Sequence, residues 1–398
     1  GGGVTEWVCG AGLSTEPRLQ DAVSECVGLI ESELAEAPAS LVFAFASGDH
    51  SESLSELPDA LSGLVGDGVL LGCSGEMIAG GGREIESGPA LSILAAVMPD
   101  SRVEPFRVTF EPTADGLLTS GCPEDLVESD DVDSVFLLAD PFSSSPQSVF
   151  DRITEQQADT ADRDIPVLGG MASGGRRPGD NHLFLGDQCY RDGAVGVVVR
   201  GPGRIGSVVS QGCRPIGPVF VVTAAEANVV QALGGRVAME VLQEMIESLD
   251  DSDRQLIGQG LHLGLAMNEY CDTFDRGDFL VSNVIGVDRE VGAVVIGHPL
   301  RIGQTVRFHV RDAVTADEDL VELLVSHRQA GATPRGALLF SCNGRGTRMF
   351  SDPDHDASTI RRELGEIPLA GFFAQGEIGP VGGQNFVHGF TASVACLG

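Results

Sequence analysis

Two polar segments near the C-terminal end of the sequence hold residue types that could do chemistry. The first is 341–346 (Ser-Cys-Asn-Gly-Arg-Gly), which directly follows the apolar run 336–340. The second is 371–380, which also follows an apolar run. Each is a strand-like run that stops at a polar tip bracketed by glycines, and such tips present polar groups on a rigid scaffold. If both tips lie at one end of one sheet, a thiol, an amide, a guanidinium and a carboxylate come within reach of one small ligand.

The first tip contains Cys342, Asn343 and Arg345. A thiol at a strand end beside an arginine could be a ligand contact or a nucleophile, whereas most cysteines are small buried packing residues. A nucleophile needs a base, and His388 could approach Cys342 only through the fold. The guanidinium of Arg345 suits a ligand carboxylate or phosphate held by two hydrogen bonds. The alternative is a structural ion pair between Arg345 and Glu377 of the neighbouring tip.

Glu377 has a counterpart in Glu76, because both follow a glycine in a similar context. A carboxylate there could accept a ligand ammonium, and together with Arg345 it would select an amino-acid-like zwitterion. The alternative is that each Glu caps a helix or binds loop amides; we favour that role for Glu76 and ligand binding for Glu377. Further ligand-binding candidates come from the second tip, the loop after it and the N-terminal counterpart: Gln375, Gly376, Asn385, His388, Cys73 and Ser74. For Asn385 and His388 the alternative is turn chemistry.

Three stretches of the chain resemble one another. Residues 70–94 and 369–395 share an apolar entry, a glycine, a Gly-Glu-apolar step, a glycine-rich loop and a second strand-like run; 167–199 is a weaker copy without the Glu. A short buried-strand candidate precedes each of them: 41–47, 135–140 and 337–342. We therefore predict a mixed α/β protein of two related halves, with mixed β-sheets flanked by helices.

Helical periodicity and charge placement predict three helices, over 225–249, 317–329 and 359–364. A chain of 398 residues is long enough for two domains. We place a lead-in segment at 1–40, a first domain at 41–218 and a second domain at 219–398.

The composition excludes several classes of partner. The chain has 58 acidic and 25 basic residues, a net charge of -33, and every basic residue is arginine. A surface this acidic opposes nucleic acid and anionic membranes as partners. No apolar run is long enough to span a bilayer, and nine scattered cysteines without a Cys-x-x-Cys motif favour a reduced cytoplasm. A high-salt host would explain the acidity and predicts stability that rises with salt, but a GC-rich genome would equally replace lysine by arginine.

Metal and phosphate motifs are absent. There is no Gly-x-x-x-x-Gly-Lys segment and no His-Glu-x-x-His segment. The acidic cluster 352–356 is interpreted as an exposed turn rather than a metal site, so no metal is expected.

The segment 212–218, which leads into 221–228, together with the two tips 341–346 and 371–380, resembles the FIST family. These are sensory domains of bacterial and archaeal signalling proteins that also occur in eukaryotic F-box proteins. The resemblance covers about 41–398, as an N-terminal and a C-terminal FIST part. It implies a cytoplasmic, non-catalytic module that binds a small ligand, with amino acids proposed, and passes its signal to a separate output protein.

Three alternatives remain open at this point. No cofactor is expected, but some family members resemble haem-based gas sensors; haem therefore stays open as an alternative, with His298 or His388 as axial ligand of a nitric oxide sensor. A second alternative is an enzyme that uses Cys342 as nucleophile. The third is a protein–protein interaction module that uses the tips structurally.

Overall fold

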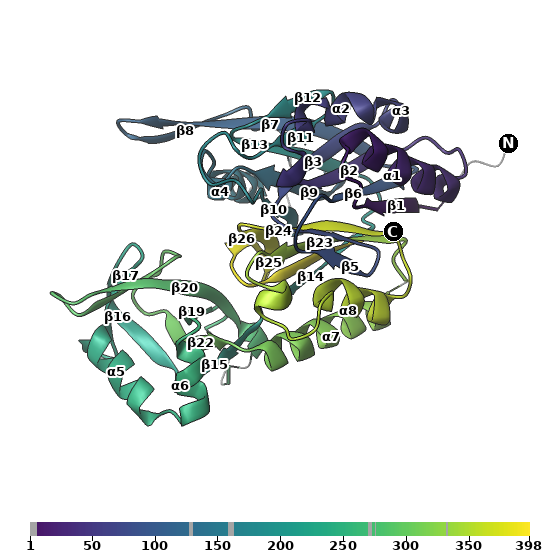
Figure 1. The fold of residues 1–398 in the computed structure, drawn as a ribbon. Helices are drawn as coiled ribbons and strands as arrows, with labels where there is room; N and C mark the ends of the chain where they lie inside the picture. The colour runs from purple at the N-terminus through teal and green to yellow at the C-terminus, as the bar shows by residue number, and fades with distance from the viewer. Residues whose placement is uncertain (1–5, 127–129, 158–162, 270–272, 275, 332) are drawn as a thin grey trace. The chain divides into compact units, whose positions relative to one another are not determined.

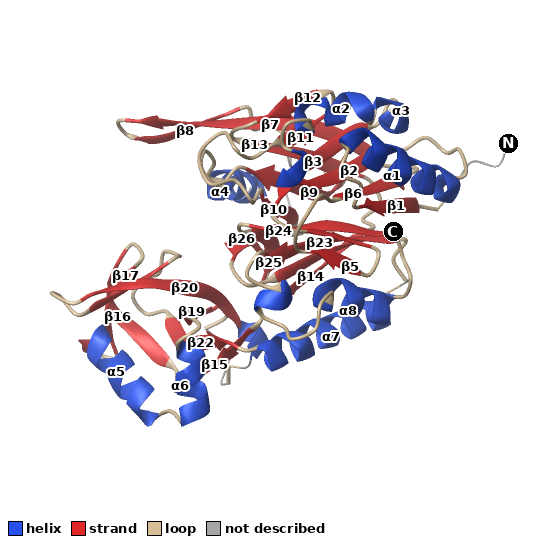
Figure 2. Cartoon of the chain, viewed as in Figure 1, coloured by secondary structure: helices blue, strands red, loops and turns tan. Residues whose placement is uncertain are grey.

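The computed structural model describes residues 6–126, 130–157, 163–269, 273–274, 276–331 and 333–398. The chain divides into two compact units, each with helices and strands (Figures 1 and 2). Unit 1 combines residues of 1–210, 320–387 and 391–398, and unit 2 combines 211–319 with 388–390. The fold is mixed α/β, as the sequence predicts.

The first sheet of unit 1 has the strand order β1-β6-β2-β3-β11-β12. Strands β2 and β3 run parallel, and β6 pairs antiparallel with β2. The strands are β1 (Val8–Ser14), β2 (Leu41–Ser47), β3 (Val69–Gly75), β6 (Leu91–Val97), β11 (Leu183–Leu185) and β12 (Gln188–Tyr190).

The second sheet has the order β26-β25-β10-β9-β13-β7-β8. Strands β9 and β10 run parallel, and β13 pairs antiparallel with β9. The strands are β7 (Arg102–Thr113), β8 (Gly116–Ser120), β9 (Val132–Ala139), β10 (Val167–Met171), β13 (Ala194–Arg200), β25 (Glu377–Val381) and β26 (Gln384–His388).

The third sheet has the order β14-β27-β23-β24-β4-β5. Strands β23 and β24 run parallel, and β27 pairs antiparallel with β23. The strands are β4 (Ile78–Gly80), β5 (Arg83–Ile85), β14 (Ile205–Ser210), β23 (Gly336–Cys342), β24 (Leu369–Ala374) and β27 (Ala392–Leu397). The predicted strands at 41–47, 135–140 and 337–342 are therefore confirmed as β2, β9 and β23.

A glycine occupies the same kind of place in each of the three parallel pairs. A Cβ atom added there would overlap a carbonyl oxygen of the neighbouring strand: Gly72 against Ala44, Gly169 against Leu137 and Gly371 against Leu339. Glycine is thus required for close backbone approach, which gives a physical reason for its recurrence in the three similar stretches. The internal repeat of two related halves stays a prediction.

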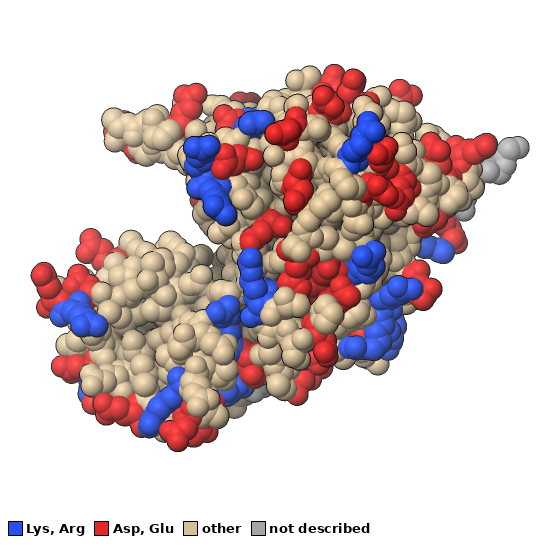
Figure 3. All heavy atoms as spheres, viewed as in Figure 1, with Lys and Arg blue, Asp and Glu red and all other residues tan. Residues whose placement is uncertain are grey.

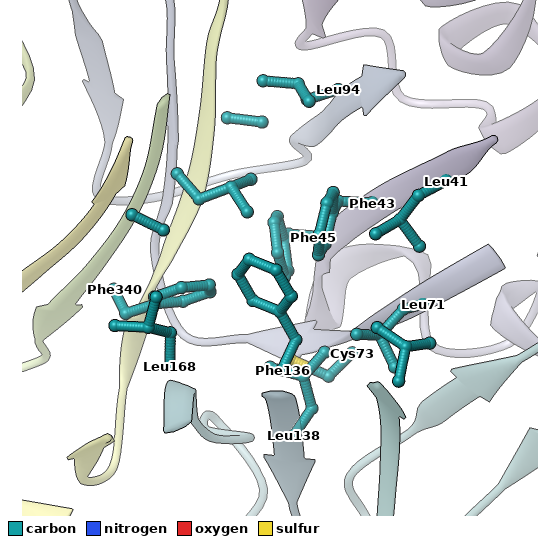
Figure 4. Packing of buried hydrophobic residues seen from close by; sticks show 14 of the residues in the cluster. Leu41, Phe43, Phe45, Leu71, Cys73, Leu94, Phe136, Leu138, Leu168 and Phe340 are labelled. Carbon is teal, nitrogen blue, oxygen red and sulfur yellow. The ribbon is translucent and has the colours of Figure 1, made fainter. Parts of the chain in front are cut away.

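The three sheets share one apolar core. Phe43 and Phe45 of β2 meet Phe136 of β9 and Phe340 of β23, as Figure 4 shows. The rings of Phe43 and Phe136 lie 5.0 Å apart, edge to face. The alternate residues of β2, Val42 and Ala44, point into a second core on the other face of the sheet. Because both faces of β2 are buried, its sequence is a continuous apolar run rather than an alternation of apolar and polar residues.

Helices cover the outer face of each sheet. The first sheet carries α1 (Leu19–Leu34), α2 (Leu57–Ala60) and α3 (Ser62–Val65), and the second carries α4 (Pro146–Gln157). The third sheet carries α8 (His355–Leu364) and the C-terminal part of α7 (Ala313–Ala330). The predicted helices at 317–329 and 359–364 are confirmed as parts of α7 and α8.

Unit 2 contains a closed barrel of six strands. The order β22-β16-β17-β21-β20-β19 returns from β19 to β22, with β15 and β18 paired at the sides. The strands are β15 (Cys213–Pro215), β16 (Phe220–Glu226), β17 (Val229–Leu233), β18 (Arg236–Val237), β19 (Leu261–Ala266), β20 (Phe279–Asp288), β21 (Ala293–Ile296) and β22 (Thr305–Arg311). Two helices, α5 (Ala238–Ser248) and α6 (Asp251–Ile257), pack against the barrel.

The predicted helix at 225–249 is wrong in its first part. Residues 229–233 form β17, and the helix α5 begins only at Ala238. Gly234 and Gly235 have φ of 56° and 77°, so the chain turns between the strand and the helix. The apolar spacing around Val229 and Val230 fits a helix or a strand. Pairing with the neighbouring strands determines that this segment is a strand.

Charged side chains are mixed on the surface. On the face shown in Figure 3, arginines lie among acidic side chains rather than in one continuous basic patch. No helix of the described ranges combines the length and apolar character needed to cross a membrane.

Candidate functional site

The two C-terminal tips lie side by side at one edge of the third sheet. Cys342, the last residue of β23, is the register partner of Ala374, the last residue of β24. The amide of Asn343 donates to the carbonyl of Ala374 at 3.0 Å. The end of β10 joins them, because the amide of Gln375 donates to the carbonyl of Met171 at 3.0 Å. Segments far apart in sequence thus meet at the ends of parallel strands.

Arg345 is fully buried in this region. Its Nη2 donates to Oδ1 of Asp356 at 2.7 Å, and its Nε donates to Oδ2 at 2.8 Å. The hydroxyl of Ser341 donates to the same Oδ2 at 2.7 Å. Burial opposes ionisation of Asp356, but the charge and hydrogen bonds of Arg345 outweigh it and hold the pKa of that carboxyl well below its usual range. Arg345 thus makes a structural pair, and its main acid is Asp356 rather than the expected Glu377.

The position of Asp356 corrects the interpretation of 352–356 as an exposed turn. Asp352 is exposed, but Asp356 is fully buried in the first turn of α8. A buried guanidinium requires a buried carboxylate, and this requirement brings Asp356 inside.

Two more carboxyls adjoin the Arg345–Asp356 pair. Glu377 is fully buried, and burial raises its pKa well above the ordinary value, although the Thr391 amide donates to its Oε1 at 2.9 Å. Burial and the charge of Asp356 raise the pKa of Glu84 to about 8. At neutral pH the Glu84 carboxyl is therefore mostly protonated, and burial disfavours the charged form of Glu377.

Cys342 adjoins the buried cluster around Arg345, and 5% of its surface is exposed. Its thiol donates to Oδ1 of Asn343 at 3.7 Å, and the amide of Gly344 donates to its Sγ at 3.3 Å. Cys342 is therefore held within the structure of the tip, with a small part of its surface open to solvent.

Partly exposed polar side chains form the outer layer of the site, which we call the rim cluster: Glu76, Asn343, Arg348 and Gln375. Nη2 of Arg348 lies 2.5 Å from Oε1 of Glu76, and their side chains are 53% and 30% exposed. The side-chain amide of Asn343 donates to Oε2 of Glu76 at 3.1 Å and to Oε1 of Gln375 at 3.2 Å. Nη1 of Arg348 donates to the carbonyl of Asn343 at 2.7 Å.

Arg348 was not among the residues singled out from sequence. It ends a single turn of 3-10 helix, Gly346–Arg348, that directly follows the first tip. The signal in the sequence was its position beside the tip, and the fold adds that Arg345 is buried whereas Arg348 is exposed.

The N-terminal counterparts have other surroundings. Cys73 is fully buried in the shared core, and burial raises the pKa of its thiol well above the ordinary value. Ser74 is buried, and its Oγ accepts the amide of His182 at 2.9 Å. Glu76 binds Arg348, as described above, and its amide donates to Oγ of Ser173 at 2.8 Å.

The remaining candidates are placed as follows. The carbonyl of Gly376 accepts the amide of Met171 at 2.8 Å, which fixes the second tip on β10. Asn385 holds the start of β10, because its side chain accepts the Val167 amide at 2.8 Å. His388 ends β26, is buried and is grouped with unit 2.

His298 follows β21 in unit 2, and burial lowers its pKa, which favours the neutral imidazole that a haem iron binds. A haem-based sensor stays a prediction.

Comparison with known proteins identifies the family of the chain. Residues 40–236 match the FIST N domain and residues 238–380 match the FIST C domain. An uncharacterized protein of Mycobacterium tuberculosis is 40% identical over 388 residues, which is 97% of this chain and 98% of that protein. An uncharacterized protein of Mycobacterium bovis is 40% identical over 390 residues, 97% of each chain. The chain belongs to the FIST family. The predicted domain bounds near 40 and 218 stay a prediction.

Proposed function

We propose that the chain is a small-ligand-binding sensory module and that its ligand is a small zwitterion of the amino-acid type, bound at the rim cluster. One observation carries the proposal. Arg348 and Glu76 place opposite charges, both partly exposed, beside the side-chain amides of Asn343 and Gln375.

The rim cluster has the groups that a zwitterion needs. The guanidinium of Arg348 can hold a carboxylate by two hydrogen bonds, and the carboxylate of Glu76 can accept an ammonium group. The two side chains bind each other in this structure, so a ligand would replace one internal pair by two ligand pairs. An exposed pair is weak, about 0–1 kcal/mol, and its exchange costs little.

The buried cluster fixes the loop that carries Asn343 and Arg348 of the rim cluster. Arg345 and Asp356 fix the loop between β23 and α8, and the amide of Arg345 donates to the carbonyl of Cys342 at 2.9 Å. In this proposal Arg345, Cys342 and Glu377 position the tips, and the rim residues contact the ligand. The signal would pass to a separate output protein.

A thermal-shift screen tests the ligand class. Amino acids, simple carboxylates and simple amines are added to the purified protein at constant ionic strength. A ligand at a hundred times its dissociation constant adds about 2.7 kcal/mol to the free energy of unfolding, so the melting temperature rises. We expect amino acids to give the larger shifts. If no zwitterion shifts the melting temperature, the proposed ligand class is wrong.

Glu76→Gln sharpens the screen, because it removes the acceptor for the ammonium group but keeps Arg348. We expect this variant to lose the preference for amino acids over simple carboxylates. If the variant keeps this preference, Glu76 is not the group that recognises the ammonium.

A further inference from the structure

A pocket of about 480 Å³ lies in unit 1 where three strands end. Its lining includes Ser74 at the end of β3, Ser173 just beyond β10 and Gly48 directly after β2. This volume falls within the range of small-molecule sites, about 300–1,000 Å³. The carboxyl ends of parallel strands are the usual place for ligands in α/β sheets. None of the four rim residues lines the pocket.

Two exposed arginines belong to the lining of the pocket. Arg176 and Arg191 both line it, and among the described residues neither guanidinium lies within ion-pair distance of a carboxylate. Nη1 of Arg191 donates to the carbonyl of Gly179 at 3.2 Å. The neighbouring Arg177, outside the lining, does pair with Asp180 at 3.6 Å. In a chain with more than two acidic residues for each arginine, two unpaired guanidiniums at one pocket indicate a site for negative charge.

His182 adds a buried polar group to the same pocket. It is 2% exposed, and neither ring nitrogen has a hydrogen-bond partner of ordinary geometry among the described residues. Burial and the charge of Arg191 lower its pKa to about 4, against a weaker opposing contact with the Asp180 backbone. The ring is therefore neutral at pH 7 and carries one N–H donor. A buried N–H donor without an acceptor is unfavourable, and a ligand oxygen in the pocket would supply the missing acceptor.

The loop that carries Arg176 is fixed by its own hydrogen bonds. Oδ2 of Asp180 accepts the amides of Arg176 and Arg177 at 3.0 and 3.2 Å. Oδ1 of Asn181 accepts the amide of Gly175 at 3.0 Å, and its Nδ2 donates to the buried Asp140 at 3.1 Å. The carboxylate of Asp180 is thus occupied by the loop itself, and the site is preorganised.

We propose that this pocket binds a small metabolite through an oxyanion group, a carboxylate or a phosphate, which Arg176, Arg191 and His182 hold. Glu52 also lines the pocket and gives an acceptor for a hydroxyl or amine elsewhere on the ligand. The site shares no residue with the rim cluster, and it stands independently of the proposed function.

Calorimetric titration with inorganic phosphate and with citrate tests the site, with KCl added to hold the ionic strength constant. The wild-type chain is compared with the double variant Arg176→Ala/Arg191→Ala. Arg177→Ala serves as a control, because it removes one positive charge (the double variant removes two) from the loop of Arg176 but outside the pocket lining. We expect saturable binding of one anion by the wild type and the control, and at least about tenfold weaker binding by the double variant.

The two titrations distinguish the sources of the oxyanion: tighter phosphate binding assigns a phosphate ligand, and tighter citrate binding assigns a carboxylate. His182→Gln keeps a neutral donor in place of the ring and should bind more tightly than His182→Leu. The proposal is overturned if neither anion binds saturably, or if the double variant binds as tightly as Arg177→Ala.

Discussion

Arg345 and Arg348 lie on the same short loop, and each pairs with a carboxylate, yet their surroundings differ. The Arg345–Asp356 pair is fully buried, with an N–O distance of 2.7 Å. The Arg348–Glu76 pair has a similar distance, 2.5 Å, but its side chains are 53% and 30% exposed. A buried pair cannot lose one partner without leaving an uncompensated charge, whereas an exposed pair can exchange a partner for a ligand. Burial therefore separates the residue that holds the site from the residue that can bind.

The largest expected effect is on the buried pair. Arg345→Met leaves Asp356 buried without its cation and should lower the free energy of unfolding by about 3–5 kcal/mol. Denaturant unfolding at pH 7 measures this loss. The double variant Arg345→Met/Asp356→Leu removes both charges and should recover most of it. A loss below about 1 kcal/mol in the single variant would contradict this prediction, because a loss that small is typical of an exposed ion pair.

A smaller effect concerns the pH dependence that burial imposes on Glu84. Burial raises the pKa of Glu84 from 4.5 to about 8, so between these values the folded chain holds a proton that the unfolded chain releases. Its contribution to stability is complete below pH 4.5 and is lost as pH rises through 8, with a slope of up to about 1.4 kcal/mol per pH unit.

Glu84→Gln should remove this part of the slope, because an amide keeps the neutral shape and can still accept the Ala357 amide. Unfolding free energies of both proteins, measured between pH 5 and pH 8, give the difference directly. Identical slopes would show that Glu84 is ionised in the folded chain.

The smallest expected effect is on the exposed pair. Arg348→Ala should lower the free energy of unfolding by less than about 1 kcal/mol, and molar KCl should reduce this difference further by screening. Unfolding curves at low and high salt measure it. A loss as large as that of Arg345→Met would contradict the distinction between the two pairs.

The sequence predicts the parts of the site that depend on local pattern. The apolar runs 41–47 and 337–342 form β2 and β23, because short continuous apolar runs are typical of strands buried on both faces. The tips at Cys342 and Ala374 meet because neighbouring parallel strands end at the same edge.

Other parts depend on contacts that no local pattern contains. Arg345 and Arg348 both lie in a polar stretch, and only the fold shows that Asp356 covers the first of them. The pocket beside His182 combines Ser74 at the end of β3 with residues that follow β2, β10 and β12. Helical and strand periodicities overlap at Val229, so barrel closure rather than local preference determines β17.

In the proposed function, Arg348 binds the carboxylate of the ligand. Calorimetric titration of the amino acid that gives the largest thermal shift tests it in two matched variants, Arg348→Ala and Arg361→Ala. Arg361 is 51% exposed and pairs with Glu366 at 2.7 Å, so it controls for the loss of an exposed ion pair. We expect Arg348→Ala to weaken binding by about tenfold or more, equivalent to about 1.4 kcal/mol, and Arg361→Ala to bind as the wild type does. Equal affinities in the two variants would contradict it.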